Sequence, residues 1–165
     1  MNKIKLYHGS LEQIAQPEIR EPNRTLDYGC GFYTTTSYQQ AEDWVARHRN
    51  DSIKPALGYV NVYEVDLDEV RKSNCLWFDG PTEDWVDFVY ANRNNRSFNH
   101  DYDFVYGPVA NDKVYAAFTL YEAGLLNKQE LIKELNVYKL VDQLLFHTEK
   151  SLNLLTFIGA KEIKL

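Results

Sequence analysis

The sequence contains little sulfur: it has two cysteines and a single methionine among its 165 residues. Cys30 and Cys75 are too few for a disulfide framework or for a zinc site built from four cysteines, and they fit a reducing compartment. The first residues, MNKIKLYHGSLEQIA, hold no apolar run long enough for a secretory signal. No stretch approaches the roughly 20 apolar residues that cross a bilayer. We therefore expect a cytoplasmic protein with no membrane partner.

The strongest catalytic signatures are also missing. The chain has no phosphate-binding loop ending in Gly-Lys-Ser/Thr, no Gly-x-Ser-x-Gly turn and no His-Glu-x-x-His helix. Gly29 and Gly31 lack the third glycine of a dinucleotide-binding loop, and a Tyr-Thr-Thr strand follows them instead of a helix. No two of the four histidines stand at metal-ligand spacing, so we expect no metal site. Nothing near Cys30 would lower its pKa, which favours an inert thiol over a nucleophile.

Charge and composition favour one folded domain over residues 1–165. Hydrophobic residues make up 44% of the chain and aromatic residues 14%, enough to bury a core and more aromatics than packing alone requires. The net charge of −6 disfavours a protein that coats nucleic acid without regard to sequence. Two small basic clusters, at 47–49 and 93–96, would serve nucleic acid only if the fold brought them together.

Alternating strand patterns and helical spacings are interleaved without a regular βαβ period, which predicts an α+β fold. The expected strands cover 3–8, 58–66, 74–78, 102–106, 143–148 and 156–165, with a Tyr-Thr-Thr strand after Gly31. The expected helices cover 37–49, a segment from Pro81 through Val89, 113–123, 127–135 and a short piece near 149–155. We expect loops over 15–31 and 92–100. Ser37 and Asn127 are the predicted helix caps.

Two short motifs remain as candidates for a binding site. His8 and Gly9 end the first strand, where an imidazole and an unhindered backbone can both face a ligand. Tyr33 begins a strand that continues with Thr34 and Thr35, and Trp44 follows Tyr33 by eleven residues, so that two aromatic faces can oppose one another across a cleft. Packing in a core or at a strand edge is the alternative for each of these side chains.

These motifs, in this order, resemble the ADP-ribosyltransferase superfamily of the His-Tyr-Glu type. The resemblance to the bacterial family catalogued as domain of unknown function 3990 is closer and spans nearly the full chain. It rests on LYHGS at 6–10, YGCGFYTTTSYQQAEDWV at 28–45, YDFVYGPVANDKVY at 102–115 and QLLFHTEKSLNLLTFI at 143–158. The first two segments indicate the chemistry, and the last two indicate the narrower family.

The resemblance implies that NAD binds as substrate in a cleft between two small, roughly perpendicular sheets, mixed or antiparallel, with flanking helices. His8 would contact the adenosine ribose, and the backbone of Gly9 would hold the nicotinamide amide. Tyr33 would stack on nicotinamide, with Trp44 completing a sandwich. The hydroxyls of Thr34 and Thr35 would support this site from their strand.

The superfamily places a catalytic glutamate on a late strand, and Gln143 stands at that position here. A glutamine can accept the ribose hydrogen bond but brings no negative charge to the oxocarbenium-like transition state. We therefore take Gln143, with Tyr33 and His8, as the expected catalytic set. Other acids that could substitute for the glutamate are Glu149, Asp103 and Asp112.

The expected function is transfer of ADP-ribose from NAD to a macromolecular acceptor. By family analogy, such a domain would be the toxin of a toxin–antitoxin or defence pair, with an antitoxin protein as a partner. The acceptor stays open among protein, RNA, DNA and a small molecule. The alternative is a catalytically silent module that binds NAD, ADP-ribose or a protein, and a purely structural interaction module is a third option.

Overall fold

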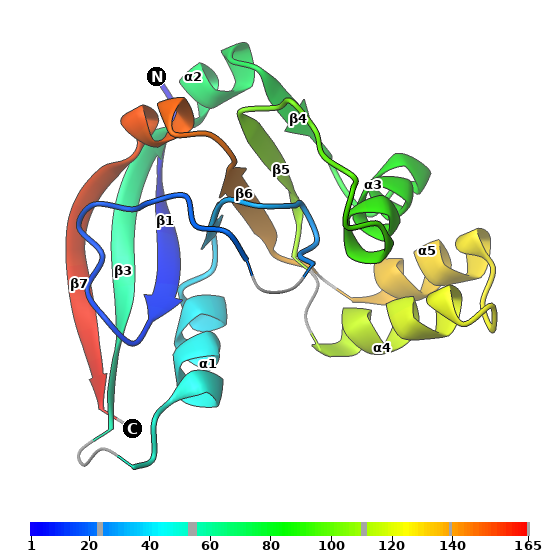
Figure 1. Ribbon diagram of the computed structural model, residues 1–165, viewed down its shortest axis with the longest axis horizontal. Coiled ribbons are helices and arrows are strands. Elements are labelled where there is room, and N and C mark those ends of the chain that lie inside the picture. The colour runs from blue at the N-terminus through cyan, green and yellow to red at the C-terminus, as the bar shows by residue number, and fades with distance from the viewer. Residues whose placement is uncertain (23–24, 53–55, 110–111, 139, 165) are drawn as a thin grey trace.

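The computed structural model describes residues 1–22, 25–52, 56–109, 112–138 and 140–164. The elements follow the chain as β1 (Lys3–Ser10), β2 (Phe32–Thr35), α1 (Tyr38–His48), β3 (Leu57–Asp66), α2 (Leu67–Lys72), β4 (Cys75–Trp77), α3 (Glu83–Asn94), β5 (Phe104–Pro108), α4 (Asp112–Glu122), α5 (Lys128–Val137), β6 (Asp142–Phe146), the 3₁₀ helix η1 (Lys150–Leu154) and β7 (Thr156–Lys164). This composition is α+β, as the sequence predicts (Figure 1).

All described strands belong to one seven-stranded sheet in the order β4-β5-β6-β2-β1-β3-β7. Every neighbouring pair is antiparallel except β4 and β5, which are parallel. The expectation of two separate small sheets is therefore wrong in this form. The sheet nevertheless has a narrow join, because β1 and β2 are paired only where Tyr7 faces Thr35. The short β2 follows β6 along its whole length and meets β1 at its last residue alone, and the two halves of the sheet are inclined to one another in Figure 1.

Two apolar cores lie on opposite sides of this sheet. Alternation along β6 divides its residues between them, since Leu145 joins one core while Leu144 and Phe146 join the other. The first core packs α3, α4 and α5 around the buried Trp85, and the second packs β1, β3, β5 and η1. Both cores anchor β6, so the strand that carries Gln143 is rigidly held.

Helix α1 packs closely against β1 and β3 because glycines face it. A Cβ added at Gly9 would lie 2.4 Å from the carbonyl oxygen of Ala41, and one at Gly58 would lie 2.2 Å from Cγ1 of Val45. Any larger residue at either position would push the helix away from the sheet. The Ser37 side chain caps α1 by accepting a hydrogen bond from the Gln40 backbone, as expected from the sequence.

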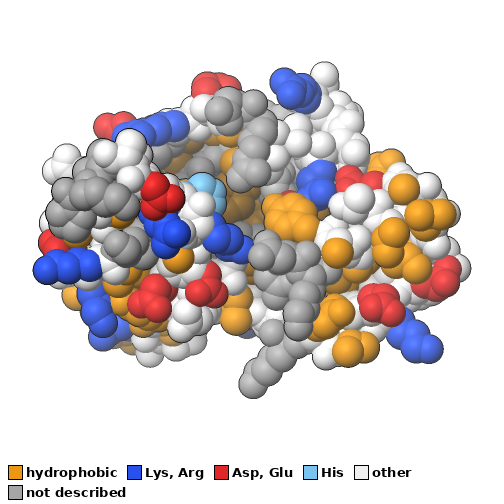
Figure 2. Space-filling model, turned by 90° about the horizontal axis from the view of Figure 1, so that it is seen from below, with side chains coloured by type: hydrophobic (Ala, Val, Ile, Leu, Met, Phe, Trp, Pro, Cys, Tyr) orange, Lys and Arg blue, Asp and Glu red, His pale blue; other side chains and the backbone are white. Residues whose placement is uncertain are grey.

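Helices α4 and α5 form a hairpin whose outer side is apolar. The exposed large apolar side chains there are Tyr115, Leu120, Leu125 and Val137. Figure 2 shows such side chains gathered over this end of the molecule, whereas charged side chains dominate the opposite end. Asn127 and Glu130 form the predicted capping box at the start of α5.

The predicted elements correspond to observed ones, with bounds that differ by one or two residues at several ends. Among the larger differences, α3 extends to Asn94 into the expected loop, and the sequence analysis predicts no helix at the position of α2. Helix α2 is short, but Asp66 caps it by accepting a hydrogen bond from the Asp68 backbone. Acidic residues in its first turn and basic residues in its last turn complement the helix dipole.

Candidate functional site

A cavity of about 150 Å³ opens where β1 and β2 diverge, between α1 and the start of β6. All the site residues expected from the sequence line it. Its described lining consists of Tyr7, His8, Gly9, Tyr33, Thr34, Thr35, Gln40, Ala41, Trp44, Val109 and Gln143. Pairing explains the convergence, because Tyr7 faces Thr35 across the narrow join and Thr35 faces Gln143 on β6.

His8 joins the two diverging strands through its side chain. Its Nδ1 lies 2.6 Å from the carbonyl oxygen of Tyr33, and a carbonyl can only accept, so Nδ1 carries the proton. Burial lowers the pKa of His8 below the ordinary value of 6.5, against the opposing effect of this hydrogen bond. The neutral ring therefore keeps an unprotonated Nε2 that can accept a hydrogen bond from a ligand hydroxyl.

Tyr33 is held in place by its hydroxyl group. The hydroxyl donates to the carbonyl oxygen of Gly29 at 2.5 Å and accepts from the backbone N–H of Tyr28 at 3.0 Å. Burial raises the pKa of the Tyr33 phenol well above its ordinary value, so the group stays neutral. With both hydrogen bonds made, the ring is preorganised at the wall of the cavity.

Trp44 approaches the same cavity from α1. Its indole stacks on the His48 ring with centroids 4.0 Å apart and an interplanar angle of 11°. His48 Nδ1 in turn lies 2.8 Å from the Trp44 carbonyl oxygen, one turn back along the helix. These contacts fix the indole orientation, while the ring borders the cavity.

The hydroxyl groups of the two threonines both bond to the neighbouring strand β6. The Thr34 hydroxyl donates to the Leu144 carbonyl oxygen at 2.8 Å, and the Thr35 hydroxyl donates to that of Asp142 at 3.3 Å. The Thr35 hydroxyl also accepts from the Ser37 backbone. Both hydroxyls therefore fasten β2 to β6 and to the start of α1, and they support the site as structural contacts.

Gln143 lies at the inner end of the cavity and is 7% exposed. Its Nε2 donates to the Pro108 carbonyl oxygen at 3.3 Å, and the Tyr28 hydroxyl donates to the same oxygen at 2.9 Å. Trp85 Nε1 donates to the Tyr28 hydroxyl at 2.8 Å. Gln143 is thus one member of a buried polar network that joins β5, β6 and α3.

The alternative acids do not line this cavity. Asp103 accepts a hydrogen bond from the Thr148 hydroxyl at 2.7 Å and lies 3.8 Å from Lys150 Nζ. Glu149 is exposed at the start of η1. Asp112 begins α4, but its side chain lies outside the described part of the structure. None of the described residues that line the cavity is acidic.

A second cavity, of about 210 Å³, adjoins the first and shares His8 and Tyr33 with it. Its other described lining residues are Ile14, Gln16, Glu18, Arg20, Gly31 and Phe32. Asn61 and Tyr63 on β3 hold Ile14 in position, since Asn61 Oδ1 accepts from its N–H at 2.8 Å and the Tyr63 hydroxyl donates to its carbonyl at 2.6 Å. The sequence analysis did not predict this second cavity, because the hydrogen bonds that hold Ile14 join residues that are far apart along the chain.

The described residues contain no cluster of side chains that would form a metal centre. Among them, no group of three or more His, Cys, Asp and Glu side chains could hold an ion. Both cysteines are free, and burial raises the pKa of each thiol, that of Cys75 to about 11. The raised pKa values favour inert thiols.

A comparison with protein families identifies the family to which the chain belongs. The model of the family described as "Protein of unknown function (DUF3990)" matches residues 4–157, and the chain belongs to this family. A comparison with curated proteins and one with solved structures each find no match. None of the helices in the described ranges has the length and apolar character needed to span a bilayer.

Proposed function

We propose that this DUF3990 protein binds NAD in the cavity at the narrow join of its sheet and transfers ADP-ribose to a macromolecular acceptor. The observation that carries the proposal is the convergence of His8, Gly9, Tyr33, Trp44 and Gln143 on one cavity of about 150 Å³. A cavity of this volume is large enough for one six-membered aromatic ring. The adjoining cavity of about 210 Å³ shares His8 and Tyr33 with the first and extends the space that a dinucleotide could enter.

Each group has a role that follows from its contacts. The nicotinamide ring would lie between Tyr33 and Trp44, both of which are fixed in orientation by their own partners. Its carboxamide would bond the backbone at Gly9, where no side chain intervenes. His8 would accept a hydrogen bond from a ribose hydroxyl at Nε2, because its Nδ1 is already used.

The proposed reaction breaks the bond between C1 of the ribose and the nicotinamide nitrogen. The electron pair leaves with nicotinamide, the acceptor nucleophile bonds to C1, and the acceptor's proton passes to solvent. Gln143 would hold the neighbouring ribose hydroxyl through its amide oxygen. Because the amide is neutral, it would stabilise the developing positive charge less than a carboxylate does.

A silent binding module is the second candidate function, and one observation favours it. The Gln143 amide is hydrogen-bonded to the Pro108 carbonyl, and no described lining residue supplies a carboxylate in its place. Binding of NAD or ADP-ribose would then be the function itself. The role of a bacterial toxin with an antitoxin partner, acting in the cytoplasm, extends the first candidate on the resemblance alone.

Replacing Tyr33 tests NAD binding. Tyr33→Ala removes the ring and should weaken NAD binding by about 1–2 kcal/mol, the scale of a lost aromatic stack with its buried area. Tyr33→Phe keeps the ring and loses only the hydroxyl contacts with Tyr28 and Gly29, so its affinity should stay closer to that of the parent. Isothermal titration calorimetry with NAD measures both.

Tyr59→Ala is the matched control, because Tyr59 lies on β3 outside both cavities. Unchanged NAD affinity in a folded Tyr33→Ala variant would remove Tyr33 from the site. Incubation of the parent with NAD and cell lysate, followed by measurement of released nicotinamide and of label transfer, then separates the transferase from the silent module.

A further inference from the structure

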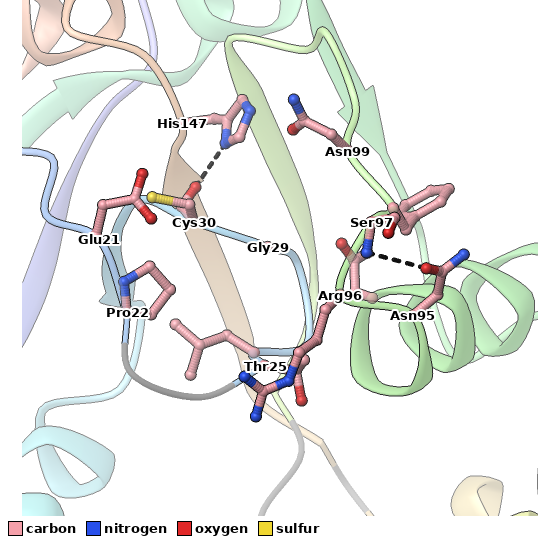
Figure 3. A pocket seen from close by; sticks show the side chains of 13 residues that line it. Glu21, Pro22, Thr25, Gly29, Cys30, Asn95, Arg96, Ser97, Asn99 and His147 are labelled. Carbon is pink, nitrogen blue, oxygen red and sulfur yellow. Dashed lines mark hydrogen bonds between the residues drawn. The ribbon is translucent and has the colours of Figure 1, made fainter.

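A larger cavity lies outside the proposed NAD site. It has a volume of about 510 Å³, within the range of ligand pockets, and shares no lining residue with either smaller cavity. One wall is formed by Glu21, Pro22, Thr25 and the segment 29–30, and the other by the end of α3 and the loop 95–99 (Figure 3). His147, just beyond β6, borders it as well.

Two asparagine side chains order the loop after α3. The Asn95 Oδ1 accepts from the Ser97 backbone at 3.0 Å, and the Asn99 Oδ1 accepts from the His100 backbone at 2.9 Å. Figure 3 shows the amide nitrogen of Asn95 turned away from the cavity, so this side chain holds the loop that carries Arg96.

Arg96 adds a positive charge on the same side. Its guanidinium forms no ion pair or hydrogen bond with any residue that the structure describes, and it borders the cavity in Figure 3. Arg93, one turn earlier, differs sharply, because it lies 3.0 Å from Glu122 and 3.5 Å from Asp27. The basic cluster at 93–96 is therefore divided between a structural arginine and one that is available to a ligand.

One carbonyl group at the end of α3 is capped by a side chain that lines the cavity, because Thr25 Oγ1 donates to the Arg93 carbonyl at 2.9 Å. Glu21, the one acidic residue in the described lining, lies beside Cys30, on the opposite wall from Arg96 (Figure 3).

Phe98 supplies an aromatic surface in the same lining. Its ring is packed edge-on against Phe88, with centroids 6.1 Å apart, and 37% of the residue is exposed. An aromatic surface beside an unpaired arginine is a combination that binds the ring and phosphate of a nucleotide.

We propose that this cavity binds a nucleotide unit, with its phosphate at Arg96 and its base against Phe98. The unit is either a free mononucleotide or one residue of a single-stranded nucleic acid. The site stands apart from the proposed NAD cleft, and its assignment does not depend on NAD binding. If the NAD proposal also holds, the two sites are separated by the chain segments 20–22 and 29–31, which border both.

Calorimetric titration of the full chain with AMP, adenosine and inorganic phosphate tests the proposal. AMP should bind at least about tenfold more tightly than adenosine, because a charge-assisted contact to phosphate is lost in the nucleoside. Arg96→Met should weaken AMP binding by about tenfold or more.

Arg49→Met is the control for loss of one exposed positive charge, since Arg49 lies at the end of α1, away from the cavity. It should leave AMP binding unchanged. Equal affinities for AMP and adenosine, or AMP binding that Arg96→Met leaves intact, would overturn the assignment. AMP that is displaced by NAD and lost in Tyr33→Ala would place the nucleotide in the other cleft and would also overturn it.

A second titration, with a short single-stranded DNA or RNA, identifies the source of the nucleotide. Binding that is tighter than AMP and sensitive to Arg96→Met assigns a polynucleotide, whereas weaker or absent binding assigns the free mononucleotide. Because Arg96→Met leaves the cavity at Tyr33 untouched, NAD binding should be unchanged in this variant. The two proposals can therefore fail separately.

Discussion

Gln143 is the residue at which the two candidate functions differ. It occupies the inner end of the 150 Å³ cavity, and its Nε2 donates to the Pro108 carbonyl beside the Tyr28 hydroxyl. A carboxylate there would lose that donor and leave the Pro108 carbonyl with the Tyr28 hydroxyl alone, so Gln143→Glu changes both the charge of the site and its contact with β5.

Two substitutions at Gln143 should have opposite effects. If the protein is a transferase, Gln143→Ala should cut nicotinamide release by roughly tenfold to a thousandfold, the range for loss of one transition-state contact. Gln143→Glu should raise the rate, because it supplies the negative charge that the amide lacks. A continuous assay of nicotinamide release from NAD measures both variants, after circular dichroism has shown that each is folded.

Gln40→Glu is the control for Gln143→Glu, because Gln40 lines the same cavity from α1 and undergoes the same amide-to-carboxylate change. It should not raise the rate. If Gln143→Ala leaves an active parent unaffected, the catalytic group lies elsewhere. If neither the parent nor Gln143→Glu releases nicotinamide, the silent module is the better description.

At the scale of elements, the contact between α1 and β3 should be sensitive to one methyl group. A Cβ at Gly58 would lie 2.2 Å from Cγ1 of Val45, a stiff and fully buried side chain. Gly58→Ala should therefore lower the free energy of unfolding by about 1–3 kcal/mol through overpacking. Urea denaturation followed by circular dichroism measures the change.

Gly159→Ala is the matched control, since Gly159 pairs with Val62 on the neighbouring strand and has nothing within 4 Å of an added Cβ. Its stability should stay within about 0.5 kcal/mol of the parent's. Val45→Ala in the Gly58→Ala background should restore part of the loss, because it removes the clashing atom. Strictly additive effects of these two substitutions would contradict the overpacking explanation.

Elements with a strong local pattern were predicted well from the sequence, and so was the set of residues that meet in the first cavity. The alternation of β1 and β3 and the helical spacing of α1 are properties of consecutive residues. The single pairing of Tyr7 with Thr35 joins residues that are far apart in the sequence, so local patterns do not reveal it, and the number of sheets was therefore predicted wrongly. The same applies to the wall held by Asn61, whose partners lie about 50 residues away. The role of Thr34 and Thr35 in joining strands needed the position of β6.

For the whole molecule, two buried histidines make stability depend on pH. Burial lowers the pKa of both His8 and His100 below 6.5, the value expected in the unfolded chain. Between 6.5 and the lower folded-state pKa, the unfolded chain binds more protons than the folded one, so stability falls as the pH falls. Each histidine contributes at most about 1.4 kcal/mol per pH unit. Above pH 6.5 both states are neutral at these rings, and the dependence should disappear.

Urea denaturation at intervals between pH 7.5 and 5.5 measures this dependence. His100→Gln and His8→Gln should each flatten the slope below pH 6.5, whatever they do to the absolute stability. His48→Gln serves as the control, because this ring lies exposed on α1, and it should leave the slope unchanged. A parent slope that survives both buried-histidine substitutions would assign the effect to other groups.

The narrow join of the sheet has a mechanical consequence. Backbone hydrogen bonds between neighbouring strands make them move together as a rigid unit. Between β1 and β2 only one residue pair is formed, and the hydrogen bond from His8 to the Tyr33 carbonyl supplements it. The two halves of the sheet, β4-β5-β6-β2 and β1-β3-β7, are therefore joined weakly, and we expect shear between them to be the easiest deformation of the sheet. The proposed ligand-binding cavity lies at this junction between β1 and β2. A ligand that bonds to both strands would stiffen the junction, so ligand binding would also change how the two halves of the sheet move relative to one another.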